Sequence, residues 1–199
     1  MKETGVIKFN CNWIHEAPLN GHLIEDLNTW RDKMFDLSFI GVNDEDIGYG
    51  NISRRFRNNE FIISGSATGK LLKLGSEHYT IVTEFDLEKN SLTAVGPILA
   101  SSESLTHAVI YQCDETVNGI IHIHHYELWK KLMNTIPTTR ADVEYGTPAM
   151  ANEMIRLFGE TNLKSQKLLV MAGHQDGIIS FGKDLNEAGN QLLNVYNAL

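Results

Sequence analysis

The sequence predicts an α/β domain in which helices cover a largely antiparallel sheet. The chain has 199 residues, 42% of them hydrophobic, which is enough for one substantial core. Short apolar segments are separated by turn residues, as strands in hairpins are. Segments with apolar residues at helical spacing lie near both ends of the chain and in its middle. We therefore expect residues 1–199 to form a single layered α/β domain.

The first half of the chain predicts one helix and a series of strands. Weak strand character over residues 6–11 comes first. Apolar residues then recur at helical spacing from Leu23 to Leu37, which predicts a helix over residues 21–38. Predicted strands separated by turn residues follow at residues 48–56, 61–63, 79–83 and 91–94.

The second half of the chain alternates helical and buried-strand patterns. The predicted helices cover residues 105–112, 126–133, 147–158 and 185–198. The predicted strands cover residues 119–125, 167–171 and 178–181. The last two strands flank a turn at residues 173–177, and such hairpins favour antiparallel pairing.

Composition narrows the class of function. Formal net charge is −8, which argues against nucleic acid or an anionic membrane surface as the main partner. No apolar run approaches the length of a membrane span, and residues 1–5 lack the apolar core of a signal peptide. Cys11 and Cys113 are too few for a disulfide framework. A reduced, cytoplasmic setting is therefore the expectation.

The most informative segment is a histidine-rich strand. Residues 119–125 read G-I-I-H-I-H-H. Because positions i and i+2 of a strand share a face, His122 and His124 would project side by side, roughly 7 Å apart at their roots. Two imidazoles placed in this way can converge on one metal ion, and a rigid strand would fix their geometry. The alternative is a hydrogen-bonded pair of histidines on a half-buried strand.

Two further segments carry side chains suited to ligand binding. Ser101, Ser102 and Glu103 precede the predicted helix 105–112, whose first turn has free N–H groups and a positive dipole end. The segment is either an anion site or ordinary N-capping by serine. His174 lies in the turn at 173–177, where it is either a third imidazole ligand or an exposed loop histidine.

Other polar residues carry weaker signals. The segments Gly50-Asn51-Ile52-Ser53 and Ser64-Gly65 are typical of turns when each is taken in isolation. Four histidines have no partner pattern, and we interpret them as structural or surface residues: His15, His22, His78 and His107.

The order of these motifs resembles that of the class II aldolase/adducin family. The similarity spans roughly residues 22–198. Each motif is weak by itself, but five from separate segments in the right order are specific, because only a shared fold would bring them together. The matching segments are Gly50-Asn51-Ile52-Ser53, Ser64-Gly65, Ser101-Ser102-Glu103, His122-Ile123-His124 and Gly173-His174, with Tyr145-Gly146-Thr147 and residues 182–188 in addition.

The resemblance implies a three-layer α/β/α fold with a central, mostly antiparallel sheet, and a homotetramer with active sites at subunit boundaries. The implied activity is a zinc-dependent aldolase that cleaves a small ketose phosphate through a metal-stabilised enediolate. The implied roles are metal ligands (Zn²⁺ or another divalent ion) for His122, His124 and His174, catalytic acid/base for Glu103, and phosphate binding for Asn51, Ser64, Gly65, Ser101 and Ser102.

Two departures from the family pattern leave the reaction open. No tyrosine matches the one that acts at the aldehyde end of family aldolases. The glycine that commonly follows the third histidine is displaced to Gly177. A ribulose-phosphate 4-epimerase and a dehydratase of a methylthioribulose-phosphate type are therefore alternatives. A non-catalytic, adducin-head-like scaffold is another, although three histidines and Glu103 would serve no purpose in a scaffold.

Overall fold

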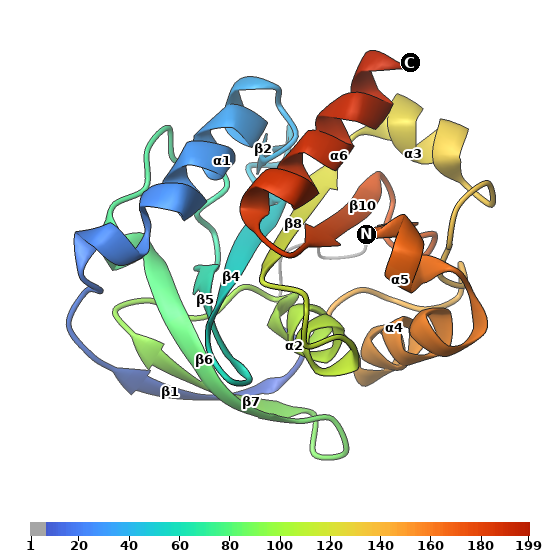
Figure 1. Ribbon diagram of the computed structural model, residues 1–199. Helices are drawn as coiled ribbons and strands as arrows, with labels where there is room; N and C mark the ends of the chain where they lie inside the picture. Colours follow the sequence, from blue (N-terminus) through green and yellow to red (C-terminus); the bar gives the residue numbers. More distant parts are fainter. Residues whose placement is uncertain (1–6) are drawn as a thin grey trace.

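The computed structural model describes residues 7–199 (Figure 1). The elements of its first half are β1 (Asn10–His15), α1 (Glu25–Asp36), β2 (Gly41–Val42), β3 (Gly48–Tyr49), β4 (Asn51–Arg57), β5 (Glu60–Ser64), β6 (Tyr79–Asp86) and β7 (Ser91–Gly96). Those of its second half are α2 (Ser104–Cys113), β8 (Gly119–His124), α3 (Tyr126–Leu132), α4 (Pro148–Glu160), α5 (Leu163–Gln166), β9 (Leu168–Val170), β10 (Gly177–Gly182) and α6 (Leu185–Asn197).

One eight-stranded sheet forms the centre of the molecule, in the order β1-β7-β6-β5-β4-β8-β10-β9. Only β1 and β7 pair in parallel, and every other neighbouring pair of this sheet is antiparallel. This arrangement confirms the predicted, mostly antiparallel sheet. β2 and β3 form a separate two-stranded sheet.

Helices cover both faces of the sheet, which confirms the three-layer architecture (Figure 1). One apolar cluster joins α2 and α4 to one face, through residues such as Leu105 and Met154. A second cluster joins α1, α3 and α6 to the opposite face, through residues such as Met34 and Leu192. β5, β8 and β10 each contribute residues to both clusters, as the pleat of a strand requires.

The pleat of β8 decides where its polar residues lie. Ile121 and Ile123 belong to the apolar cluster beneath α1 and α6. Ile120 belongs to the cluster on the α2 side, so His122 and His124 share that side. α2 and the two histidines therefore meet on one face of the sheet.

The structure differs from the sequence prediction mainly at the ends of elements. The strand predicted at 6–11 is β1, shifted toward Asn10–His15, because its backbone pairs with β7 and the Trp13 indole donates to the carbonyl of Gly96 at 2.9 Å. Position 6 and the segment 1–5 lie outside the described residues.

The helix predicted at 21–38 is a 3-10 turn at Gly21–Leu23 followed by α1. The strand predicted at 48–56 is divided into β3 and β4 at Gly50, which has a φ of 73°. The short elements β2 and α5 have no periodicity long enough to predict, since contacts with distant segments hold them in place. Among residues 7–199, no helix is both long and apolar enough to cross a membrane.

Candidate functional site

Three histidines from two distant segments converge on one point. The Nε2 atom of His124 lies 3.1 Å from Nε2 of His122 and 2.9 Å from Nε2 of His174. His122 and His174 are buried, and His124 is half-buried. The structure thus brings together the three residues that the sequence singled out, with one nitrogen of each ring turned inward.

The second nitrogen of His122 shows why its ring is turned inward. Nδ1 lies 3.1 Å from the carbonyl oxygen of Ile178 on β10, which can only accept a hydrogen bond. Nδ1 therefore carries a proton, which leaves Nε2 as the nitrogen that a metal ion would use. Such a carbonyl contact is the usual support of a metal-binding histidine.

The turn before β10 supplies the third ring. His174 donates its N–H to Met171, and Gly177 donates its N–H back to the His174 carbonyl at 2.9 Å. A Cβ at position 177 would lie 2.9 Å from the His174 ring and 3.3 Å from the His122 ring. The displaced glycine of the sequence therefore makes room for two converging imidazoles.

Glu103 lies beside this cluster at the N-cap of α2, with 3% of its surface exposed. Its Oε2 atom lies 2.9 Å from Nε2 of His122 and accepts a hydrogen bond of 2.9 Å from the Asn51 amide. Its Oε1 atom lies 3.8 Å from Nε2 of His174 and has no hydrogen-bond partner among the described residues. One carboxylate oxygen is thus held, and the other is free to act.

Burial and charge oppose each other at Glu103. Burial by itself would raise the pKa of the carboxyl, but the imidazoles of His122, His174 and His124, through the positive charge that imidazoles carry in the acid range, together hold that pKa well below its usual range. The side chain is therefore ionised at neutral pH.

The imidazoles respond in the opposite direction. Burial lowers the pKa of His174 to about 4, despite the opposing charge of Glu103. Burial, followed by the neighbouring rings of His174 and His122, also lowers the pKa of His124. Both rings are therefore neutral at pH 7, the state in which imidazole binds a metal ion.

The donor set fits a divalent metal of the zinc type. Three imidazole nitrogens with an adjacent carboxylate are ligands that Zn²⁺ accepts, and three protein ligands leave room for a substrate. The three nitrogens lie within 4.8 Å of one another. The hydrogen bond that holds the His122 ring on the Ile178 carbonyl supports the same conclusion.

A pocket of about 870 Å³ opens above the cluster. Of the residues expected to bind phosphate, Asn51, Gly65, Ser101 and Ser102 line it. Ser64 lies behind it: the side chain is 2% exposed, and its hydroxyl accepts the Ile52 N–H. The structure thus places four of the five in the pocket wall, with the Asn51 amide directed to Glu103.

Several pocket residues were absent from the sequence prediction. Residues 66–69 line the pocket next to Gly65, and their only signal in the sequence is a run of small residues. The ring of Tyr49 lies 5.2 Å from that of His124, and the ring of Tyr145 lies 4.3 Å from that of His174. Tyr145 lies in a segment that matches the family pattern, but only tertiary structure brings these two tyrosines to the histidines, so no local pattern could have assigned them to the site.

A buried polar cluster lies behind Glu103 on the same side of the sheet. The Ser53 hydroxyl lies 2.7 Å from Nδ1 of His107 and 2.8 Å from the Tyr111 hydroxyl. His107 is fully buried, and burial lowers its pKa to about 3 despite the nearby charge of Glu103. This buried position agrees with the interpretation of His107 as a structural or surface residue, and the structure decides for the former.

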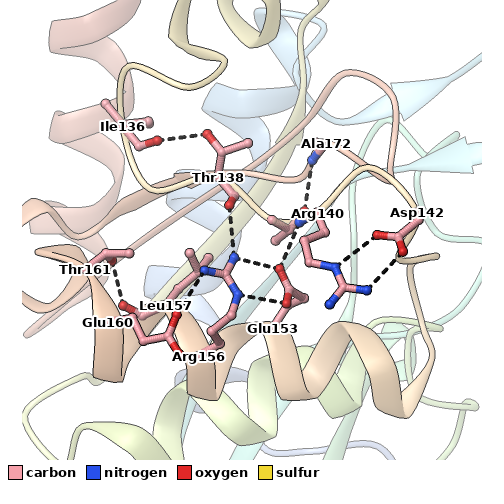
Figure 2. Close-up of polar contacts among 11 residues, drawn as sticks. Ile136, Thr138, Arg140, Asp142, Glu153, Arg156, Leu157, Glu160, Thr161 and Ala172 are labelled. Atoms are coloured by element: carbon pink, nitrogen blue, oxygen red, sulfur yellow. Dashed lines mark hydrogen bonds and ion pairs between the residues drawn. The ribbon is translucent and has the colours of Figure 1, made fainter.

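A second network holds the loop that carries Tyr145 (Figure 2). The Glu153 carboxylate accepts hydrogen bonds from the Arg140 backbone N–H at 2.8 Å and from the Arg156 guanidinium at 2.8 and 2.9 Å. Arg156 also donates to the Thr138 carbonyl, at 3.3 Å. A buried carboxylate on α4 therefore anchors the loop from behind.

Comparison with known proteins places the chain among relatives of known fold. The family model described as Class II Aldolase and Adducin N-terminal domain matches residues 44–199. An L-fuculose 1-phosphate aldolase is similar in structure, with a TM-score of 0.68 and 17% sequence identity over 90% of this chain and 84% of that one.

Two further solved structures have the same fold. A sugar-phosphate aldolase from Thermotoga maritima has a TM-score of 0.66 and 13% identity, over 89% of this chain and 93% of that one. YgbL from Klebsiella pneumoniae, a candidate aldolase, epimerase or decarboxylase, has a TM-score of 0.65 and 15% identity, over 87% of this chain and 84% of that one.

Proposed function

The chain belongs to the class II aldolase and adducin N-terminal domain family, and on that premise we propose that it is a zinc-dependent aldolase that cleaves a small ketose phosphate. The observation that carries this proposal is the convergence of His122, His124 and His174 beside Glu103. A scaffold domain would have no use for three inward-facing imidazoles next to a buried carboxylate, since burying such groups is costly.

The three histidines would hold the metal. When bound, Zn²⁺ supplies Lewis-acid chemistry that offsets negative charge on substrate oxygens. The chain contributes neutral imidazoles, a pre-set orientation of the His122 ring and a pocket large enough for a small sugar phosphate. Because the imidazoles already face one point, a metal ion can bind there with little rearrangement of the chain.

Glu103 would move the proton. In aldol addition it takes a proton from the carbon beside the substrate carbonyl, and in cleavage it returns that proton. Oε1 is the atom available for this transfer, because Oε2 accepts the Asn51 amide and faces His122. Glu103 is ionised at neutral pH, so it is in the form that can accept a proton.

Ser101, Ser102 and the loop that begins at Gly65 would bind the substrate phosphate. All line the pocket, and the two serines stand just before α2. Backbone N–H groups and hydroxyls at such a position attract an anion. A phosphate held there would place the reacting carbons of the sugar over the histidine cluster and so lower the entropic cost of reaction.

The decisive test is proton exchange. Glu103→Gln should retain the metal but abolish exchange of solvent deuterium into dihydroxyacetone phosphate, because the amide cannot accept the proton. The measurement is NMR of the recovered compound together with metal analysis. Glu187→Gln, a carboxylate change outside the pocket, should leave exchange intact. Undiminished exchange in Glu103→Gln would remove Glu103 from this role.

The substrate is to be found by screening ketose phosphates with zinc, with both cleavage and epimerisation followed. Epimerisation without release of an aldehyde would replace the aldolase proposal by the epimerase one. A homotetramer with sites at subunit boundaries, a cytoplasmic location and a single domain all stay predictions.

A further inference from the structure

The proposed anion subsite lacks a cation in its wall. The described residues that line the pocket include no lysine or arginine. Their carboxylates are Asp44, Glu45, Glu103, Glu144 and Asp176. A phosphate dianion entering this pocket would meet neutral donors and several negative charges. Positive potential from outside the lining residues would therefore strengthen the binding of a phosphate.

Arg31 on α1 is a cation of this kind. Its side chain is 1% exposed, and its guanidinium donates to the carbonyls of Thr68 and Gly69, each at 3.2 Å, and of Leu72 at 3.0 Å. Thr68 and Gly69 line the pocket, so one layer of backbone separates the guanidinium from the cavity. The side chain lies directly behind the loop at residues 65–69, which we name the anion loop.

The charge of Arg31 is poorly compensated in the chain. Its nearest carboxylate, Asp32, lies 3.8 Å away, and its Nε atom is buried without a hydrogen-bond partner among the described residues. Its other contacts are neutral carbonyls and the ring of Phe35, 4.5 Å from the guanidinium carbon. A buried guanidinium with mostly neutral partners is costly. An anion on the far side of the anion loop would offset part of that cost.

The contacts of Arg31 also fix which way the loop's peptide groups point. All described peptide bonds are trans. With the carbonyls of Thr68 and Gly69 directed at Arg31, the N–H groups that follow them, on Gly69 and Lys70, point to the opposite side. Neither N–H donates a backbone hydrogen bond among the described residues. The same loop holds Ala67 at a φ of 59°, which is unfavourable for a residue with a Cβ and must be held by its surroundings.

We infer that Arg31 is a positioning residue for the anion subsite. It holds two carbonyls of the anion loop away from the pocket, leaves the opposite N–H of Gly69, a lining residue, available, and places its positive charge behind the loop for a substrate phosphate. This inference rests on the proposed function, in which that loop receives the phosphate. It assigns a specificity role to a helix residue that does not itself touch the substrate.

The test uses inorganic phosphate as the probe and calorimetry as the readout. The full chain is titrated both metal-loaded and after chelation, so that phosphate bound to metal is separated from phosphate bound to the loop. Arg31→Met should weaken phosphate binding about tenfold or more, since a charge and the carbonyl contacts are both lost. Arg31→Lys keeps the charge but loses the planar guanidinium that donates to several carbonyls at once. Its phosphate affinity should lie between that of Arg31→Met and that of the original chain.

The matched control is Arg55, a second arginine that caps backbone carbonyls and stacks on a ring. Its guanidinium donates to the carbonyls of Val117, Asn58, Tyr111 and Asp114 and lies 4.8 Å from the Tyr111 ring, away from the pocket lining. Arg55→Met should lower thermal stability as Arg31→Met does, but leave phosphate affinity within about twofold.

Turnover provides a second readout. With a sugar phosphate that the enzyme cleaves, Arg31→Met should raise KM with kcat nearly unchanged, because the loss is in binding and the histidine cluster is untouched. Equal phosphate affinity in Arg31→Met and the original chain, an equal loss in Arg55→Met, or no phosphate binding at all would overturn the inference. If Arg31→Met fails to fold, Arg31→Lys decides, and an unchanged affinity there overturns it.

The two proposals can fail separately. If no ketose phosphate is turned over but phosphate affinity depends on Arg31, the proposed function falls and the inference stands. If cleavage is found but phosphate affinity and KM are indifferent to Arg31, the function stands and the inference falls.

Discussion

The two sides of the pocket are built in different ways. The sheet side consists of Asn51 on β4, His122 and His124 on β8, and Glu103 at the start of α2. The loop side consists of residues 65–69, 141–145 and 172–176. On the sheet side, ladder hydrogen bonds and two apolar clusters fix each backbone. On the loop side, a few buried charged side chains from other elements fix it, notably Arg31 and Glu153.

This difference determines how each side should respond to mutation. Side chains on the sheet side stand on a rigid frame, so removing one deletes its chemistry and leaves its neighbours in place. Loops held by single anchors lose position by degrees when an anchor is weakened, because their local stability is lower. Changes on the sheet side should therefore be nearly all-or-none, and changes to the anchors of the loop side graded.

The largest effect is expected from His124→Ala. His124 lies within 3.1 Å of both other ring nitrogens, so its loss leaves only two imidazoles. Metal content should fall from about one ion per chain to near zero, and activity should fall by about a thousandfold or more. Elemental analysis and turnover measure the two effects.

His125→Asn is the matched control for this change. His125 is the next residue but caps α3, where its Nδ1 accepts the Leu128 N–H at 3.1 Å. Asparagine can supply the same cap. The variant should keep its metal. An unchanged metal content in His124→Ala would refute the assignment of ligands.

A smaller effect is expected at His107, behind the sheet side. Its pKa is about 3 in the folded protein, against an ordinary value near 6.5. As the pH falls, the unfolded chain therefore binds a proton at this histidine before the folded protein does. The contribution of His107 to stability is complete above pH 6.5 and is lost as the pH falls toward 3. The loss should reach about 2–3 kcal/mol by about pH 4.5. Denaturant unfolding across this range measures it.

His107→Asn should remove this part of the pH dependence and leave the parts that come from His174 and His124, whose pKa values burial also lowers. Asparagine can keep a hydrogen bond to the Ser53 hydroxyl, which lies 2.7 Å from Nδ1 of His107, but it does not titrate. The control His22→Gln, at an exposed position, should leave the loss of unfolding free energy at acid pH unchanged. If His107→Asn shows the same loss as the original chain, His107 is not its source.

The smallest effects are expected on the loop side, at the network drawn in Figure 2. Glu153 is 6% exposed and binds the Arg140 backbone and the Arg156 guanidinium. Glu153→Gln should cost about 1–2 kcal/mol of unfolding free energy, because charged hydrogen bonds become neutral ones. Metal content should not change. Thermal unfolding and elemental analysis test both statements.

Arg140→Ala sharpens that result. The Arg140 side chain pairs with Asp142 at the surface, where their side chains are 62% and 69% exposed. Its removal should cost less than about 0.5 kcal/mol, since solvent screens the pair and the backbone bond to Glu153 survives. Equal losses in the two variants would show that the buried carboxylate does not anchor the loop.

The comparison also explains which parts of the site could be predicted from the sequence. The pair His122 and His124 follows from strand periodicity, because i and i+2 share a face in any strand. The small-residue loop and the serines before α2 follow from turn and capping chemistry. These are properties of neighbouring residues, so the chain displays them before it folds.

Distances across the fold could not be predicted in this way. The approach of Glu103 to His122, the bond from Asn51 to Glu103 and the position of Arg31 behind residues 68–69 join segments far apart in the chain. The order of motifs indicated the family fold and, through it, that His174 would join the pair. The contacts of the individual side chains needed the structure.

By itself, the sequence determined the mostly antiparallel layered fold, the histidine pair on one face of a strand and the presence of an ionisable residue at the start of a helix. Tertiary structure alone decided which oxygen of Glu103 is free, which residues line the loop side and which buried cation stands behind the anion loop. The physical reason is range: periodicity and capping act within a few residues, whereas burial, electrostatics and packing depend on neighbours that only the folded chain provides.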